Sequence, residues 1–325
     1  MACTAVPRQP CRTSFARSHA LHANDGWFKR ALMVLAVGVG ALVGNARAAD
    51  HALVMWIGQY PEASARLHGA PVDGRLAQEF MVRALRVPAG QMVVLAERQL
   101  TLANLQAAFD HLRLRVRAGD RVFVYFSGHG QRRARTTGAG CREGIMTADG
   151  SLYFEELFRA ALEELAVQPG VQVVMFNDSC YSGGIGPGGG PTRPAVQAAA
   201  QAKRYPLPDT GAAGSAADAR CAAVSNAKGG LTPRSYGADD RLLYLSAAGE
   251  DEAAWSTAEG SHATRAWHAC LLQPRRGDDT DGDGWLNGHE LARCAQNWLN
   301  TWMPQERQTL GAQYNSHLRL LKLPP

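Results

Sequence analysis

The sequence lacks a hydrophobic run long enough to cross a membrane. Its longest apolar stretch, residues 31–44, falls short of the about 20 residues that a spanning helix needs. Basic residues precede this stretch and Ala46-Arg47-Ala48 follows it, which is the pattern of an export signal with an A-x-A cleavage site. We expect residues 1–48 to be a signal peptide and the mature chain to be periplasmic or secreted, with no stable membrane insertion after cleavage. An uncleaved anchor or a misassigned start codon is the alternative.

The rest of the chain also lacks an excess of positive charge. Six of the 34 basic residues and one of the 29 acidic residues lie within residues 1–48, so residues 49–325 carry 28 of each. Nucleic acids and anionic membranes attract proteins through clustered positive charge. We therefore expect no nucleic-acid partner. The 277 residues after the signal suit one large α/β domain or a domain with an appendage.

Cysteine is scarce, and an odd number remains after the signal. In an exported protein, five cysteines indicate one free thiol with the others able to pair. We expect Cys180 to be the free one. The pairing of the others stays open, because each is at least as well explained as a buried reduced thiol, and no His and Cys spacing matches a structural zinc site. The other four are Cys141, Cys221, Cys270 and Cys294.

Large apolar residues are almost absent between Gly183 and Asp240, where Gly, Pro, Ala and Ser dominate. Such a stretch buries too little surface to offset the entropy of ordering it, and a long one inside a compact domain is usually functional. We expect residues 183–240 to be a flexible linker within a domain that covers residues 49–325.

Elsewhere, short apolar runs predict buried strands, and apolar residues at three- and four-residue spacing predict helices. Thr101 is suited to cap one helix, and Asp149-Gly150 to turn a hairpin over residues 145–153. Strands that alternate with helices pair in parallel through right-handed crossovers. The expected strands are residues 51–57, 92–96, 121–126, 171–176, 242–245 and 318–323, and the expected helices are residues 76–84, 102–116, 154–166, 263–272 and 288–303.

A histidine and a cysteine each follow directly on one of these strands. Residues 121–126 run into Ser-Gly-His129, and residues 171–176 run into Asn-Asp-Ser-Cys180. The carboxyl ends of parallel strands share one edge of a sheet, where ligands usually bind. In cysteine catalysis a thiolate attacks, and a nearby imidazole takes its proton and later protonates the leaving amine. The alternative is a core cysteine and a turn histidine.

Two short motifs resemble the active-site motifs of metacaspases and related bacterial caspase-like peptidases. They are Phe126-Ser-Gly-His129-Gly130 and Asp178-Ser-Cys180-Tyr-Ser-Gly183. His129 and Cys180 are 51 residues apart, close to the about 50 residues known for caspases. The resemblance implies a caspase-like α/β sandwich, with a mostly parallel central sheet flanked by helices on both faces. It also implies a cysteine endopeptidase that acts on peptide or protein substrates.

The resemblance assigns roles to individual residues. His129 and Cys180 are the catalytic dyad, and the backbone N–H groups of Gly130 and Cys180 hold the oxyanion. In metacaspases, acidic residues that match Asp178 and Asp73 form a pocket for Arg or Lys, since burying any other partner leaves the charge unpaired. The alternatives are that Asp178 caps its own turn and that Asp73 caps a helix.

The linker gains a role from the same resemblance, because caspase-fold enzymes are often cut between the cysteine-bearing part and the last strands. We expect self-cleavage in residues 183–240, with an unprocessed loop as the alternative. Tyr181 stands where many metacaspases have histidine, so a caspase-fold protease with Asp or Asn preference stays open, as does a non-catalytic, calcium-binding interaction module. The candidate cleavage sites are Arg193, Lys203, Arg204, Arg220, Lys228 and Arg234.

An acidic run near the C-terminus matches a calcium-binding loop. Residues 279–290 carry suitable residues at the ligand positions of an EF-hand loop and a glycine at its turn. We expect one structural Ca²⁺ and no cofactor in the cysteine chemistry itself. An acidic turn that binds nothing is the alternative. The expected ligands are Asp279, Asp281, Asp283, Trp285 (through its carbonyl), Asn287 and Glu290.

Overall fold

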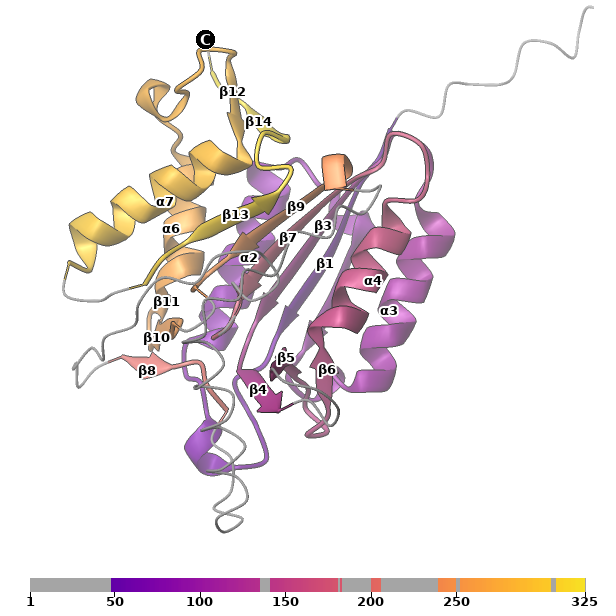
Figure 1. The fold of residues 1–325 in the computed structure, drawn as a ribbon, viewed down its shortest axis with the longest axis vertical. Helices are drawn as coiled ribbons and strands as arrows, with labels where there is room; N and C mark the ends of the chain where they lie inside the picture. The colour runs from indigo at the N-terminus through magenta and orange to yellow at the C-terminus, as the bar shows by residue number, and fades with distance from the viewer. Residues whose placement is uncertain are drawn as a thin grey trace, which may run out of the picture. The chain divides into compact units, whose positions relative to one another are not determined.

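The computed structural model describes residues 48–134, 141–180, 182, 200–205, 239–249, 252–304 and 308–324. Within them, the central feature is a six-stranded sheet in the order β13-β9-β7-β3-β1-β2 (Figure 1). All neighbours are parallel except β13, which is antiparallel to β9 at one edge. The strands are β1 (Asp50–Trp56), β2 (Met92–Ala96), β3 (Arg121–Ser127), β7 (Gln172–Asp178), β9 (Leu242–Ser246) and β13 (Gly311–Tyr314).

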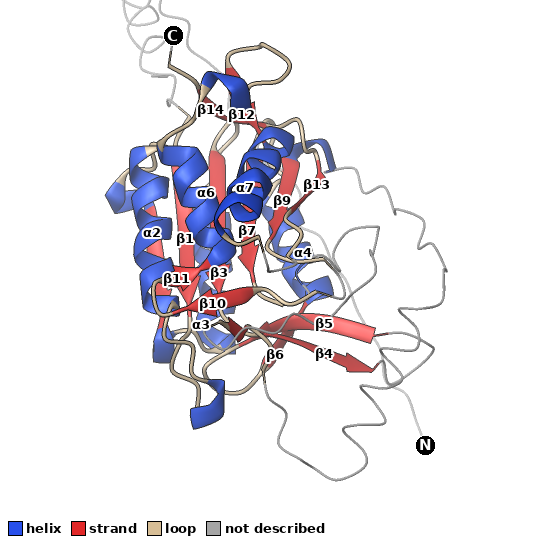
Figure 2. Ribbon diagram, turned by 90° about the vertical axis from the view of Figure 1, so that its left-hand side faces the viewer, coloured by secondary structure: helices blue, strands red, loops and turns tan. Residues whose placement is uncertain are grey.

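Helices cover both faces of this sheet (Figures 1 and 2). Alternate residues of β1 enter two separate cores, Ala52 and Val54 on one face and Leu53 and Met55 on the other. Burial on both faces explains why the strands read as unbroken apolar runs. One face carries α2 (Ala70–Arg83), α6 (His262–Leu272) and α7 (Gly288–Trp302), and the other carries α3 (Leu102–Arg115) and α4 (Glu155–Leu165).

Three smaller sheets accompany the central one in the described part of the chain. Two of them lie near the carboxyl ends of the parallel strands (Figure 2). The predicted hairpin is confirmed, with Met146 opposite Leu152 across its turn. The sheets consist of β4 (Gly130–Ala134), β5 (Cys141–Met146) and β6 (Leu152–Phe154); of β8 (Gln201–Ala202), β10 (Trp255–Thr257) and β11 (Gly260–Ser261); and of β12 (Trp285–Asn287) and β14 (Arg319–Lys322).

The predicted fold class is confirmed, since five parallel strands lie between two helical layers. Thr101 caps α3 by accepting a hydrogen bond from the Asn104 N–H group at 3.2 Å. The sequence does not predict β13, because this half-buried edge strand has no apolar run. β4 is also absent from the expectation, since polar and basic residues dominate it.

The expectation that residues 183–240 form a flexible linker is wrong for residues 201–205. β8 pairs antiparallel with β10, and the side chains of Lys203 and Tyr205 are buried. These residues gain their order from partners distant in sequence, which local composition does not report. Most of the remaining linker lies outside the described residues, as do the predicted signal peptide and Tyr181.

A disulfide between Cys270 and Cys294 joins α6 to α7. Cys180 is a free thiol, as expected. Cys221 and the side chain of Cys141 lie outside the description. Among the described residues, none of the helices combines the length and the apolar character that crossing a membrane requires.

Candidate active site

β3 and β7 bring the two predicted catalytic residues to the same edge of the sheet. Ser127 at the end of β3 pairs in register with Asp178 at the end of β7. His129 and Cys180 each follow two residues later, so they leave neighbouring strands side by side. This edge is where the loops of a parallel sheet form a crevice.

The loop after β1 fixes the imidazole of His129. The hydroxyl of Tyr60 accepts a hydrogen bond from the His129 backbone N–H group (2.8 Å), and the carbonyl of Ala65 lies 2.7 Å from Nε2. Because a carbonyl only accepts, Nε2 carries the proton and Nδ1 presents a lone pair. Burial lowers the pKa of His129 to about 4, and the charge of Lys203 acts in the same direction. The ring is therefore neutral at pH 7, as a general base must be.

Cys180 is only 2% exposed, and its Sγ lies 3.7 Å from the carbonyl oxygen of Ala254. Burial raises the pKa of Cys180 to about 12. The thiol is therefore neutral in this state, and its proton has to pass to a base as the sulfur attacks. Gly130 faces it closely, because a Cβ at position 130 would lie 2.1 Å from the Cys180 carbonyl oxygen. No larger residue fits there without a backbone shift.

Two fully buried carboxylates, Asp73 and Asp178, form an acidic pair near this edge of the sheet. Asp73, in the first turn of α2, accepts hydrogen bonds from the hydroxyl of Ser127 (2.7 Å) and the N–H group of Ser261 (2.6 Å). Asp178 accepts from the hydroxyls of Ser261 and Thr264. Ser261 thus contacts both carboxylates. The N-cap residue of α2 is Gly69, and no side chain caps the helix there. The two carboxylates are linked through shared partners, and among the described residues Asp178 accepts from another segment and not from its own turn.

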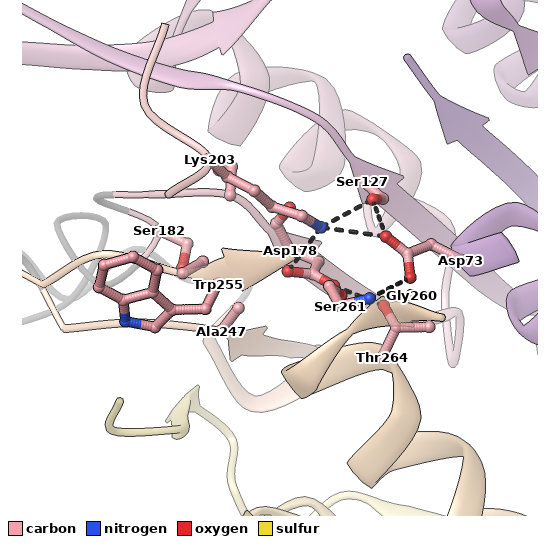
Figure 3. Close-up of polar contacts among 12 residues, drawn as sticks. Asp73, Ser127, Asp178, Ser182, Lys203, Ala247, Trp255, Gly260, Ser261 and Thr264 are labelled. Carbon is pink, nitrogen blue, oxygen red and sulfur yellow. Dashed lines mark hydrogen bonds and ion pairs between the residues drawn. The ribbon is translucent and has the colours of Figure 1, made fainter. Parts of the chain in front are cut away.

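The side chain of Lys203 lies between the two carboxylates (Figure 3). Its Nζ lies 3.2 Å from Asp73 Oδ2 and 3.0 Å from Asp178 Oδ1, and donates to the Ser127 hydroxyl at 2.8 Å. Burial alone would lower the pKa of Lys203, but the two carboxylates outweigh burial and raise it. A buried ammonium ion needs such partners, because leaving it unpaired costs several kcal/mol, on the order of 3–5.

The main chain around Lys203 lies in the site as an extended strand. The Lys203 N–H group donates to the Ala254 carbonyl at 2.9 Å, and the Lys203 carbonyl accepts from the Gly130 N–H group at 2.9 Å. The predicted oxyanion donor at Gly130 therefore already contacts the carbonyl of Lys203. Cys180 Sγ approaches the same Ala254 carbonyl, so the thiol and the Lys203 N–H group share one contact, while the residue after His129 holds the Lys203 carbonyl.

The sequence predicts the dyad, the oxyanion donor and both carboxylates, but it does not predict what holds them. Most of the missed residues act through a backbone carbonyl or a single hydroxyl, which leaves no recognisable pattern. Lys203 is predicted only as one of six basic cleavage candidates, and nothing in the local sequence distinguishes it from the other five. The missed residues are Tyr60, Ala65, Ser127, Lys203, Ala254, Ser261 and Thr264.

The predicted calcium loop lies away from this edge, next to β12 and β14. One carboxylate oxygen from each of Asp279, Asp281 and Asp283 lies within 4.8 Å of the others. Glu290 closes the loop, since its carboxylate accepts from the N–H groups of Thr280 at 2.6 Å and Asn287 at 3.0 Å. Such an all-oxygen donor set fits the chemistry of Ca²⁺.

Asp283, one of the expected ligands, has both a hydrogen-bond donor and a cation as partners. The N–H group of Trp285, at the start of β12, donates to Asp283 at 2.8 Å. Arg319 of β14 forms an ion pair with Asp283 at 2.7 Å and lies over the Trp285 ring. A cation bound at the three aspartates would therefore compete with the guanidinium of Arg319 for Asp283.

Comparison with known proteins identifies relatives for most of the domain. The profile of the family described as "Caspase domain" matches residues 49–281. Metacaspase-4 of Arabidopsis thaliana is 30% identical over 135 residues, or 39% of this chain and 32% of that protein. Metacaspase-7 of the same plant is 30% identical over 146 residues, or 42% of this chain and 36% of that protein. Metacaspase-1A of Neurospora crassa is 28% identical over 161 residues, or 46% of this chain and 35% of that protein.

The matched part of the chain thus spans about a third of the length of these relatives. A crystal structure of a Geobacter sulfurreducens protein has a TM-score of 0.55 and 15% identity, with 85% of this chain and 100% of that chain covered. This likeness concerns the fold alone. Because the family profile spans well over half of the residues, the chain belongs to the caspase domain family and is similar to metacaspases.

Proposed function

We propose that this protein is a cysteine endopeptidase that cleaves after Arg or Lys through the dyad of His129 and Cys180. One observation carries the proposal: the ammonium of Lys203 sits between Asp73 and Asp178 while its carbonyl accepts from the Gly130 N–H group. A basic residue thus has its side chain between the two acidic residues and its carbonyl on the residue that follows His129, which supports the arrangement that we propose for a substrate.

The proposed chemistry requires these groups at the scissile bond. As Sγ of Cys180 bonds to the carbonyl carbon, the thiol proton passes to Nδ1 of His129, and the N–H groups of Gly130 and Cys180 hold the oxyanion. The C–N bond then breaks, and the imidazolium gives its proton to the leaving amine. Water, deprotonated by the imidazole, next cleaves the thioester to give the carboxylate product and the free thiol.

The pocket accounts for the preference for Arg or Lys. Its two buried carboxylates are satisfied by a cation, whereas an Asp side chain would add a third negative charge and an Asn side chain would leave the charges uncompensated. Peptides that end in Arg, Lys, Asp or Asn before a coumarin amide test this directly. Equal or faster hydrolysis of the Asp or Asn peptide would contradict the assignment in favour of the alternative protease.

We further propose that the chain cleaves itself between Lys203 and Arg204. The pocket favours this bond over the one after Arg204, whose side chain is exposed. Purified protein, its Cys180→Ala form and its Lys203→Arg form are incubated in parallel. We expect cleavage in the first and third only, with a new N-terminus at Arg204. Cleavage of the Cys180→Ala form would exclude self-processing. A new N-terminus other than Arg204 would show that a different bond is cut.

The dyad itself is tested by labelling Cys180 with a thiol-directed electrophile at neutral pH. An active dyad predicts labelling that is lost in His129→Ala, because the imidazole is the base. Labelling that is the same in both proteins would favour a non-catalytic interaction module of the same fold.

A second proposal is that residues 279–290 bind one Ca²⁺. The convergence of three aspartates within 4.8 Å supports it. Titration with Ca²⁺ should change the fluorescence of Trp285, and the change should be lost in Asp281→Asn. The absence of a response at millimolar Ca²⁺ would count against the site.

Export and cleavage after Ala48 are proposed from the sequence, and the N-terminus of the mature protein tests both.

A further inference from the structure

The second residue after the Lys203–Arg204 bond is held as firmly as Lys203 itself. Arg204 is exposed, but Tyr205 is only 8% exposed and belongs to the core that contains β1 and β3. Its ring centroid lies 5.4 Å from that of Tyr60 and 5.6 Å from that of His129, edge-to-face in both cases. The Tyr205 N–H group also donates to the Gly130 carbonyl at 3.3 Å.

The partners of Tyr205 come from the loop that positions the imidazole. Tyr60 packs against His129 with ring centroids 4.8 Å apart, and Gly128 leaves room for it, since a Cβ there would lie 2.7 Å from the Tyr60 hydroxyl. Glu62, at the exposed rim, accepts a hydrogen bond from the Tyr205 hydroxyl at 3.4 Å. One loop therefore orients the imidazole and also lines the space that Tyr205 fills.

We propose that Tyr60 and His129 form a subsite for an aromatic side chain at the second position after the scissile bond, an inference that rests on the proposed endopeptidase activity. Tyr205 occupies this subsite in the intact chain. Edge-to-face aromatic contacts add to the effect of burial, and here one wall is the imidazole itself. An aromatic residue bound there covers one side of the imidazole on which the chemistry depends.

The walls predict an order of preference. Tyr and Phe supply the ring that both walls contact, whereas Leu supplies burial without the edge-to-face geometry and Ala supplies neither. Tyr exceeds Phe by a small factor only, because Glu62 is exposed and its hydrogen bond is long. A Glu residue is disfavoured, since it would place a carboxylate beside Glu62 and against two rings.

The first test uses internally quenched peptides with the sequence Gln-Ala-Lys-Arg-X and a polar tail, where X is Tyr, Phe, Leu or Ala. We expect kcat/KM to be about tenfold higher for Tyr and Phe than for Ala, and the Tyr-to-Phe ratio to fall towards one in Glu62→Gln. A Lys-coumarin amide, which has no residue X, reports the proposed function separately. Its hydrolysis together with equal rates for Tyr and Ala peptides would overturn the subsite alone.

The second test does not depend on peptide cleavage. In the Cys180-containing full chain, the thiol is buried and its Sγ shares the Ala254 carbonyl with the Lys203 N–H group, so loss of the anchor at Tyr205 should loosen this segment and speed labelling of Cys180 by iodoacetamide. We expect Tyr205→Ala to be labelled several-fold faster than Tyr205→Phe, which keeps the ring. Mass spectrometry of the labelled chain restricts the measurement to Cys180 in uncut protein. Equal labelling of the two variants would overturn the subsite, even if no peptide of any kind is hydrolysed.

Discussion

Two clusters of carboxylates in the described part of the chain differ in what neutralises them. Asp73 and Asp178 are fully buried, and the cation between them is Lys203 from the same chain. Asp281 and Asp283 are exposed, and Arg319 contacts the second of them from the surface. The buried carboxylates of the first cluster require a cation to balance their charge, whereas water solvates the exposed carboxylates of the second. The first cluster therefore suits the selection of one side chain, and the second suits the exchange of ions.

The largest expected effect comes from removing the buried cation. In a Cys180→Ala background, which keeps the chain uncut, Lys203→Met should lower the free energy of unfolding by about 3 kcal/mol at pH 7, because it leaves two buried carboxylates without a cation to balance their charge. Urea unfolding measures the change. The loss should shrink as the pH falls, since burial raises the pKa of Asp73 and a protonated carboxyl needs no cation.

The matched change in the exposed cluster is Asp281→Asn. Without calcium we expect its unfolding midpoint to equal that of the parent protein, because the carboxylate is solvated in both the folded and the unfolded chain. Equal effects of Lys203→Met and Asp281→Asn would contradict the distinction between the two clusters.

A second prediction concerns acid. Catalysis needs neutral His129, so activity falls as the pH drops through the pKa of the imidazole. Burial lowers that pKa to about 4 while residues 201–205 cover the site, so self-cleavage should persist to roughly that pH. Once the segment has left and water reaches the ring, the pKa returns towards its ordinary value near about 6.5.

Peptide hydrolysis by the cleaved protein should therefore fail at a higher pH than self-cleavage does. Rates of both reactions between pH 4 and 8 measure the difference. Coincident acid limbs would mean that the segment does not shield His129, or that it stays in place after cleavage.

The smallest effect is expected at Arg319. Arg319→Gln removes a cation that competes for Asp283, so Ca²⁺ affinity should rise by roughly threefold, an estimate for one exposed charge in high dielectric. Calorimetric titration measures the affinity, and high salt should reduce the difference between the two proteins. A weaker affinity in Arg319→Gln would show that Arg319 supports the loop instead of competing with its ligand.

Sequence was informative where neighbours in the chain share an environment. The strand of residues 171–176 is buried on both faces, so its apolar composition alone predicts a central position in the sheet. The residues that follow it lie at the carboxyl edge of the sheet because the strands are parallel. Periodicity likewise located α3 and α4. Asn287 and Glu290 cap the start of α7. Both residues are also expected calcium ligands, so the sequence alone does not distinguish the capping role from the calcium role.

Sequence was uninformative where order depends on distant contacts. Lys203 meets Asp73 across 130 positions and Ser127 across 76, and its local sequence carries no apolar pattern. Ala65 contributes only a carbonyl oxygen to His129, and any residue type has one. Such roles become visible only when the chain is folded.

The segment of residues 201–205 belongs to the same molecule as the acidic residues that Lys203 contacts. Cleavage of its Lys203–Arg204 bond within one molecule would follow first-order kinetics, with a half-time that does not change on dilution. The fraction of cut protein would then depend on the time since folding and not on the protein concentration. If this cleavage takes place, a substrate from another molecule would reach the acidic pair only after the bond is cut, so activity would depend on the time since folding and not on the protein concentration.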